Sequence, residues 1–396
     1  MENHPIYILG ERISKAICNT KLKHMDKKIK VIIGINNFFV GGAGKLIADQ
    51  VKYFDKEKFE LHLVTLFQDE SRESLYYLLP KDIEAHALRF KSFRDLWAWA
   101  DLIKVIYKIK PDVVLSSLFF SNTVFRVLKI LFGYRVITIE QNTYTDKTKV
   151  KILVDKMLSY ITYRIVAVSK AVADFTAKQG KISRSKFLVI FNCINLEEIN
   201  TFKKQYDKVS LRKELGFRVD DRVVINVARL VKQKNHDLLI HSFHEFCKKK
   251  NNYKLLILGG GSLEGELNQL IKDLGVEDRV FMMGLRRDVY KYYILSDFFI
   301  STSHIEGLSV AYLEAMAFGL PLLVTKTGGT DDIIVEGRNG YFIEEETVED
   351  VVSGLIKMSN VDLQRMGSEA SEVAKNYSIQ ENVRRYEELF SSCYSD

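Results

Sequence analysis

The stretch Phe298–Thr325, FFISTSHIEGLSVAYLEAMAFGLPLLVT, contains a complete strand–helix–strand unit. Its first four residues form an apolar run typical of a buried strand, and a helical pattern then continues to Phe318. The Gly-Leu-Pro sequence that follows ends a helix in the expected order, and Leu322–Thr325 predicts the next strand. Two strands joined through a helix are the unit from which parallel α/β sheets are built.

The same alternation extends from this unit through most of the chain, in two successive series. The strands expected in the first series are Lys30–Asn36, Leu61–Phe67, Asp112–Ser116, Arg135–Glu140, Ile165–Ser169 and residues 187–191. Those expected in the second are Arg222–Val227, Lys254–Leu258, Arg279–Met283, Phe298–Ser301 and Leu322–Thr325. Helical patterns such as Lys45–Phe54, Phe93–Ile109 and Lys149–Tyr163 lie between the strands. The fold class predicted is therefore α/β, with two doubly wound Rossmann-like domains.

The domain organisation follows from these two series and a polar join between them. Residues 1–28 are expected to form an N-terminal extension, 29–200 the first domain and 205–377 the second, with a C-terminal helix at 378–396 packing back on the first domain. A chain of 396 residues with 47% hydrophobic residues is long enough to bury two cores.

The distribution of charge and the spacing of the cysteines limit the kinds of partner and the cellular compartment that fit the sequence. Residues 1–200 carry 32 lysines and arginines against 21 acidic residues, whereas the remainder carries 26 against 30. The basic first half suits an anionic partner, although a lysine-rich solvated surface gives the same balance. The four cysteines are far apart, so neither a disulfide framework nor a zinc site is expected, and a cytoplasmic location fits. No apolar run is long enough to span a bilayer.

The two glutamates of the opening stretch carry its most specific signal. Glu306 follows a strand and Glu314 comes eight positions later, on the second turn of the predicted helix. This spacing resembles the paired-glutamate signature of retaining family 4 glycosyltransferases, which have the GT-B fold, in which two Rossmann-like domains face each other across a cleft. The resemblance implies that Glu306 faces the sugar, that Gly307 permits the turn, and that Glu314 accepts hydrogen bonds from a ribose diol. The N–H groups of Leu308, Ser309 and Val310 at the helix start would bind a diphosphate. Two solvated glutamates near a helix start are the competing interpretation.

A second segment, Val227–Asp237 (VARLVKQKNHD), follows the first strand of the second domain. It is similar to the family's phosphate-binding segment, in which an arginine and a lysine five positions later reach the donor diphosphate. Arg229 and Lys234 occupy these positions, and we expect them to be exposed cations at the cleft edge that stabilise the departing nucleoside diphosphate. The sequence contains no Asp-x-Asp pair for a metal-bound diphosphate, so no metal and no further cofactor are expected at this site.

Glycine turns supply the remaining candidates. Gly260, in LGGGSLEGE, resembles a turn where the backbone passes close to the nucleotide, and Gly284 and Leu285 fall where the family's backbone brackets the base. In the first domain, Phe38–Lys45 (FFVGGAGK) is not a P-loop, because phenylalanine replaces the first required glycine and leucine follows the lysine. Gly41 and Gly42 instead match a turn through which the first domain of such transferases approaches the donor.

One family feature has no counterpart in the first domain. Many members have a histidine after a middle strand, facing the reacting sugar, but neither Ser116–Asn122 nor Glu140–Tyr144 contains one. Glu140, Gln141 and Asn142, which begin the segment Glu140–Tyr144, either face the cleft or belong to the edge of the core.

The function implied is transfer of a sugar from a nucleotide-sugar donor, expected to be uridine-based, to a glycan or lipid-linked glycan acceptor with retention of configuration.

Two helices mix aromatic and basic residues, at Ser92–Lys110 and Lys147–Arg164. Such helices suit an anionic membrane surface, which would place the protein peripherally on the inner face of the plasma membrane. An ordinary core stripe with solvated lysines is the alternative. A nucleic-acid partner is not expected. A nucleotide-sugar epimerase, a phosphorylase and a non-catalytic sugar-nucleotide or glycan-binding protein of the same fold remain alternative functions.

Overall fold

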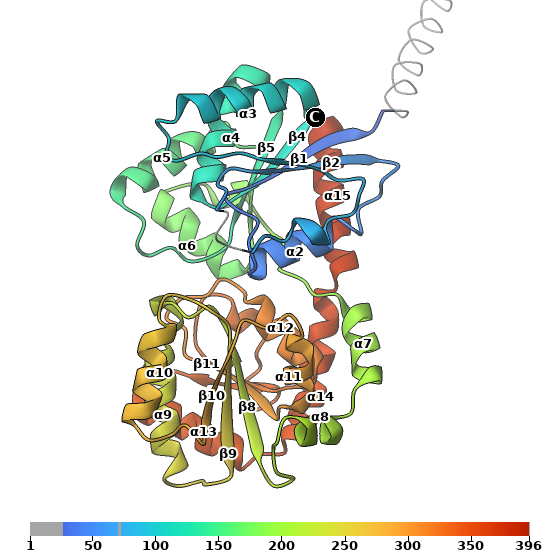
Figure 1. Cartoon of the computed structure of the whole chain (residues 1–396). Coiled ribbons are helices and arrows are strands. Elements are labelled where there is room, and N and C mark those ends of the chain that lie inside the picture. Colours follow the sequence, from blue (N-terminus) through green and yellow to red (C-terminus); the bar gives the residue numbers. More distant parts are fainter. Residues whose placement is uncertain (1–26, 70–72, 396) are drawn as a thin grey trace, which may run out of the picture.

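The computed structural model describes residues 27–69 and 73–395, and these contain two parallel sheets, each covered by helices on both faces (Figure 1). The first sheet has the strand order β3-β2-β1-β4-β5-β6-β7 and the second the order β10-β9-β8-β11-β12-β13. The first comprises β1 (Ile29–Ile35), β2 (Phe59–Thr65), β3 (Glu84–Ala87), β4 (Val113–Ser117), β5 (Arg135–Glu140), β6 (Arg164–Ala167) and β7 (Phe187–Val189). The second comprises β8 (Arg222–Val227), β9 (Tyr253–Leu258), β10 (Val280–Gly284), β11 (Phe298–Ser301), β12 (Leu322–Thr325) and β13 (Gly340–Ile343). The predicted fold class is confirmed.

Helices connect successive strands and cover the sheets. In the first domain they are α2 (Gly42–Gln50), α3 (Leu96–Ile109), α4 (Phe119–Phe132), α5 (Lys149–Ser159) and α6 (Lys170–Gly180). In the second they are α9 (His236–Cys247), α10 (Glu264–Asp273), α11 (Val289–Leu295), α12 (Val310–Ala317), α13 (Val348–Ser359) and α14 (Leu363–Ala374), preceded by α7 (Leu196–Gln205) and α8 (Lys208–Glu214). The expected N-terminal extension lies almost entirely outside the described residues. In the part of the chain that the structure describes, no helix combines the length and the apolar character needed to cross a bilayer.

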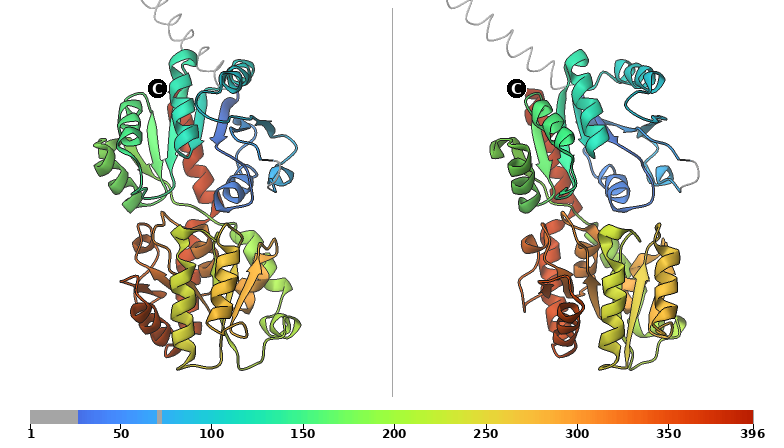
Figure 2. Two further views of the ribbon diagram at one scale, coloured as in Figure 1. Left: turned by 60° about the vertical axis from the view of Figure 1, so that its left-hand side comes forward. Right: turned by 90° about the vertical axis from the view of Figure 1, so that its left-hand side faces the viewer.

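The last helix, α15 (Ile379–Ser395), leaves the second domain and runs along the first (Figures 1 and 2). Val383, Tyr386 and Phe390 on this helix are buried in the same core as β1 and β4. At the other crossover, Phe202 of α7 already packs edge-on against Tyr290 of α11, so the chain joins the second domain from about Leu196 onward. Two crossings of the chain therefore connect the domains.

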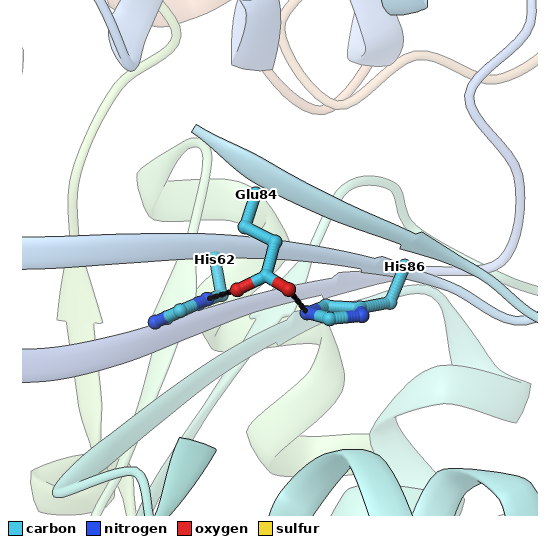
Figure 3. A group of neighbouring side chains, drawn as sticks. All are labelled: His62, Glu84 and His86. Carbon is cyan, nitrogen blue, oxygen red and sulfur yellow. Dashed lines mark ion pairs between the residues drawn. The ribbon is translucent and has the colours of Figure 1, made fainter. Parts of the chain in front are cut away.

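The edge strand β3 is absent from the sequence prediction. Its sequence, Glu-Ala-His-Ala, contains no large apolar or β-branched residue, and most of it is exposed. Pairing with β2 fixes its register, with His62 opposite Glu84 and Val64 opposite His86. Successive strand residues alternate between the two faces, so the side chains of His62, Glu84 and His86 gather on one face of the sheet (Figure 3).

Candidate active site

The loop after β11 places Glu306 at the carboxyl edge of the second sheet. Its carboxylate is buried, forms an ion pair with the ammonium group of Lys234, and accepts a hydrogen bond from Ser303 Oγ at 3.3 Å. Sequence reasoning assigned Glu306 to the sugar and Lys234 to the diphosphate as separate contacts. The structure brings them together, and the side chain of Lys234 is only 12% exposed, so it is not the exposed cation that was expected.

The loop that carries Lys234 is held in place by the same segment. Gln233 Nε2 donates to the carbonyl oxygen of Ile305 at 2.7 Å, and the N–H of His304 donates to the carbonyl oxygen of Gln233 at 3.0 Å. Asn235 then adopts a left-handed conformation with φ of 52°, which asparagine tolerates better than most residues, and α9 begins immediately after it. Burial and the neighbouring Lys234 lower the pKa of His236 to about 4, so its imidazole is neutral at pH 7.

Arg229 lies in the loop that follows β8 and, unlike Lys234, is exposed as predicted. Among the described residues its guanidinium forms no ion pair, so its charge is available to a ligand. Burial raises the pKa of Tyr144 in the first domain, and Arg229 opposes that shift, so this cation is within electrostatic reach of the opposite domain.

The start of α12 presents unused hydrogen-bond donors. Ser309 occupies the N-cap position, but its side chain forms no capping hydrogen bond. No described residue accepts a hydrogen bond from the backbone N–H groups of Leu308, Ser309 or Val310. Leu308 itself is buried, and Asn192 Nδ2 donates to its carbonyl oxygen at 2.7 Å across the domain boundary. The helix start can therefore bind an anion with its N–H groups.

Glu314 lies on the second turn of α12, where Tyr293 donates to its carboxylate at 3.2 Å. Burial raises the pKa of Glu314 to about 7, against the influence of Lys45, whose positive charge lowers it. Lys45 belongs to α2 in the first domain and pairs with Asp49 at 2.5 Å. The carboxylate of Glu314 thus titrates near neutral pH, and a cation of the opposite domain lies near it.

The glycines that follow β9 and the glycine that ends β10 lie at the same edge of the sheet. A Cβ at Gly259 or Gly261 would lie within 2.3 Å of a carbonyl oxygen of the Val227–Leu230 segment, so the backbone on either side of Gly260 packs closely against that segment. Gly260 has room for a side chain, and its nearest neighbour is the Cβ of Leu285 at 3.8 Å. Gly284 has a φ of 67° and accepts a hydrogen bond from the N–H of Gly259. Leu285 is 56% exposed and offers an apolar surface beside this turn.

The backbone of Gly307 is not in the left-handed region, so the need for glycine at this position comes from packing. A Cβ there would lie 2.1 Å from the carbonyl oxygen of Gln141 in the first domain, so only glycine permits this approach of the two backbones. Gly41 and Gly42 begin α2, which contacts α12 across the boundary. These residues are therefore brought to the donor side of the second domain.

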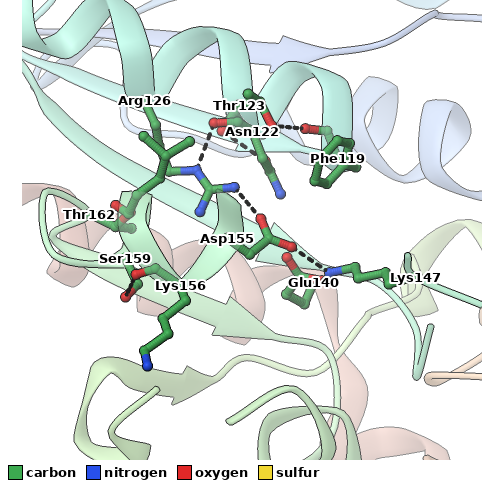
Figure 4. Close-up of polar contacts among 12 residues, drawn as sticks. Phe119, Asn122, Thr123, Arg126, Glu140, Lys147, Asp155, Lys156, Ser159 and Thr162 are labelled. Carbon is green, nitrogen blue, oxygen red and sulfur yellow. Dashed lines mark hydrogen bonds and ion pairs between the residues drawn. The ribbon is translucent and has the colours of Figure 1, made fainter. Parts of the chain in front are cut away.

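A buried charge network holds the first-domain loop that meets Gly307 (Figure 4). Asp155 accepts from Arg126 Nη2 at 2.6 Å and from Lys147 Nζ at 2.9 Å, and Lys147 also pairs with Glu140 at 3.1 Å. Burial raises the pKa of Glu140, and Lys147 opposes that rise. Glu140 therefore belongs to the core edge, whereas the carbonyl oxygen of Gln141 and the side chain of Thr143 lie against glycines of the second domain.

Several residues near the site were missed or only partly interpreted from sequence. The sequence pattern assigns no site role to Lys45, Tyr293 or Thr143. Thr143 Cγ2 lies 3.0 Å from the Cβ position of Gly328, which follows β12. No local pattern marks these residues, because only the packing of the two domains brings them to the cleft.

Comparison with known proteins relates both halves of the chain to glycosyltransferases. A model described as "Glycosyl transferases group 1" matches residues 207–377, and one described as "Glycosyltransferase Family 4" matches 40–198. An uncharacterized glycosyltransferase of Methanocaldococcus jannaschii is 24% identical over 85% of this chain and 88% of its own length. The N-acetylgalactosamine-N,N'-diacetylbacillosaminyl-diphospho-undecaprenol 4-alpha-N-acetylgalactosaminyltransferase of Campylobacter jejuni is 30% identical, over 53% of this chain and 55% of the relative.

Solved structures give the same result for the fold. HepE of Anabaena in complex with UDP-glucose superposes with a TM-score of 0.79 and 18% identity, covering 92% of this chain and all of that one. The chain spans about half the length of several curated relatives, including the Campylobacter enzyme. Each half of the chain thus matches a glycosyltransferase family model, and the solved structures show that the two halves together have the GT-B fold.

Proposed function

We propose that the protein transfers a sugar from a UDP-sugar to a glycan or lipid-linked glycan acceptor, with retention of configuration and without a metal at the donor site. The observation that carries the proposal is that the free N–H groups at the start of α12, the Lys234–Glu306 pair and the exposed Arg229 all follow the neighbouring parallel strands β8 and β11 at one edge of the sheet. Together they offer positive charge and donors to a diphosphate. HepE, a structural neighbour, binds UDP-glucose in its crystal, which supports the choice of uridine.

The residues around this anion site have complementary roles in the proposal. Glu314 accepts hydrogen bonds from the ribose diol, and the apolar surface of Leu285 with Gly260 and Gly284 brackets the base. Glu306, buried beside Lys234, faces the transferred sugar. As the glycosidic bond breaks, the diphosphate gains negative charge, and the two cations and the helix N–H groups stabilise that charge.

A nucleotide-release assay with a panel of UDP-, GDP- and ADP-sugars tests this function. We expect release of UDP from a UDP-sugar, stimulated by a glycan or lipid-linked acceptor. Interconversion of the donor sugar without release would favour an epimerase, and tight binding without either reaction would favour a non-catalytic binding protein. Either outcome would contradict the proposed transfer.

We expect Glu314→Gln to weaken the binding of uridine and UDP at pH 8, because a charged acceptor for the ribose diol becomes a neutral one. The loss should be about 1–3 kcal/mol, or roughly 5- to 150-fold in Kd. Isothermal titration calorimetry measures it, and Glu264→Gln, at an exposed glutamate of α10, is the matched control.

The pH dependence of uridine binding tests the same role. Burial raises the pKa of Glu314 to about 7, so the acceptor is ionised above this pH and protonated below it. Uridine affinity of the wild type should therefore rise between pH 6 and pH 8, whereas that of Glu314→Gln should stay nearly constant. Equal profiles for both proteins would remove Glu314 from the ribose site.

Activity should survive excess chelator, because the proposed donor site offers cations and N–H groups to the diphosphate where a metal would need carboxylates. The measurement is turnover with and without EDTA, at a temperature well below the melting transition. Loss of turnover that manganese or magnesium restores would contradict the metal-free stabilisation of the leaving group.

We further propose contact with an anionic membrane through the first domain. Val150, Leu153 and Met157 are 71%, 56% and 64% exposed along one side of α5, with lysines beside them. On α3, Trp97 and Tyr107 are 84% and 70% exposed. Exposed apolar side chains flanked by basic residues suit a membrane interface.

Leu153→Glu and Met157→Glu together should reduce sedimentation with vesicles that contain phosphatidylglycerol, because two carboxylates replace apolar contacts and repel the anionic surface. Binding of the wild type should also weaken with added salt. Val219→Glu, at a fully exposed position of the second domain, is the control. Equal sedimentation of all three proteins would place the membrane contact, if any, elsewhere.

A further inference from the structure

A repeated Glu-x-His pattern lies on the two outer strands of the first sheet. Glu60 and His62 are on β2, and Glu84 and His86 are on β3. In the parallel register His62 lies opposite Glu84, and residues two apart on a strand share a face. All four side chains therefore lie on the same face, and Figure 3 shows the carboxylate of Glu84 between the two imidazole rings.

The hydrogen bonds of His62 leave one of its ring nitrogens facing this group. Its Nε2 lies 2.9 Å from Glu60 Oε1, and a carboxylate can only accept, so Nε2 carries the hydrogen. The lone pair is then on Nδ1, which is buried and has no hydrogen-bond partner among the described residues. His62 as a whole is 6% exposed, so this nitrogen lies inside the protein. His86 Nε2 is likewise buried without a hydrogen-bond partner.

The spacing of the group is that of ligands around a small cation. His62 Nδ1 and His86 Nε2 each lie 3.6 Å from an oxygen of Glu84, which is too long for a hydrogen bond. All three ligand atoms lie within 4.8 Å of one another. Tetrahedral zinc with bonds of about 2.0–2.1 Å places its ligands roughly 3.3–3.4 Å apart, so small side-chain movements would complete the site.

We propose that His62 Nδ1, His86 Nε2 and the Glu84 carboxylate bind one Zn²⁺ ion, with water as a fourth ligand. Glu60 is a positioning residue that fixes the tautomer and the ring orientation of His62, as carboxylates commonly do behind metal-bound histidines. Lys108 pairs with Glu84 at 2.7 Å but is 68% exposed, so its ammonium can move to solvent when the cation binds. Two imidazoles and one carboxylate favour zinc over magnesium or calcium.

The ion would cross-link β3 to β2. The strand β3 has four residues and buries almost none of its side chains, so its edge position rests mainly on backbone pairing. Binding to the folded state alone raises the stability of that state. The site is on the first domain, and the residues proposed for the donor are on the second, so its role is structural and separate from the proposed chemistry.

Zinc titration of tag-free, chelator-stripped protein by calorimetry tests the proposal, with thermal melts alongside. We expect one equivalent to bind and to raise Tm, with magnesium giving neither effect. Glu60→Gln should weaken zinc binding about 10- to 100-fold, the usual effect of removing a partner behind a ligand. His62→Gln and His86→Gln should weaken it at least as much, and His241→Gln, at an exposed histidine of α9, should not.

Thermal melts of each variant in the presence of chelator show whether the variant folds without zinc. If His62→Gln does not fold, zinc binding by His86→Gln tests the proposal, because His86 is less buried than His62. The proposal is overturned if the wild type shows no saturable binding near one equivalent. It is also overturned if a folded His86→Gln protein binds zinc as tightly as the wild type and His241→Gln.

Discussion

Arg229→Ala and Lys234→Ala should each lower turnover on the order of a hundredfold or more, which is the usual loss when one donor to a developing negative charge is removed. Both cations face a diphosphate whose charge grows as the sugar leaves, so the loss should fall on kcat more than on KM. The double variant should lose less than the product of the single losses, because both residues serve one ligand. Lys232→Ala, at an exposed lysine of the same loop, is the matched control.

The two variants should differ in stability, and this difference distinguishes catalysis from folding. Arg229 is exposed, so Arg229→Ala should leave Tm almost unchanged. Lys234→Ala leaves the buried carboxylate of Glu306 without its cation and should lower Tm. Adding Glu306→Gln should restore part of the stability but none of the turnover. Normal turnover in both single variants, or losses only in step with Tm, would place the phosphate site elsewhere.

Asp155→Ala should destabilise the protein by about 3–5 kcal/mol, the cost of removing one partner from a buried ion pair. Asp155 bridges Arg126 and Lys147, whose side chains are 2% and 8% exposed, and its loss leaves two buried cations with Glu140 as their single counter-ion in the network. Chemical denaturation of the folded state measures the effect. Turnover should also fall, because Glu140 directly precedes the loop that meets Gly307.

An exposed ion pair of the same domain provides the comparison for this stability effect. Arg184 and Asp174 are 2.5 Å apart but 45% and 68% exposed, so Asp174→Ala should cost well under about 1 kcal/mol. Equal losses for Asp155→Ala and Asp174→Ala would contradict a role for burial in the network.

The sequence predicted the parts of the fold that depend on local pattern. Apolar runs such as Arg222–Val227 are strands because both faces of the sheet are covered, and Gly319 ends α12 with a φ of 82°. The strand β3 was missed because its register depends on β2 and not on its own side chains. The grouping of His62, Glu84 and His86 could not be predicted for the same reason, because it depends on the pairing of β3 with β2.

The candidate site was predictable on one side of the cleft only. The second domain carries the four residues that the sequence identified, Glu306, Glu314, Arg229 and Lys234, in the loops after β8 and β11 and in α12. In these segments residues that are close in the sequence are also close in space. The pairing of Lys234 with Glu306 and the contact of Gly307 with Gln141 depend on how loops distant in the chain meet. Sequence spacing carries no information about such contacts, so the burial of Lys234 and the reason for Gly307 became visible only in the structure.

The position of UDP in a crystal of the complex tests the central claim most directly. We predict that diphosphate oxygens lie about 2.7–3.2 Å from the N–H groups of Ser309 and Val310, with Arg229 and Lys234 within hydrogen-bonding reach and the ribose diol on Glu314. No metal ion should bridge the phosphates. A diphosphate bound away from the start of α12, or held there by a metal and not by these cations, would contradict the account.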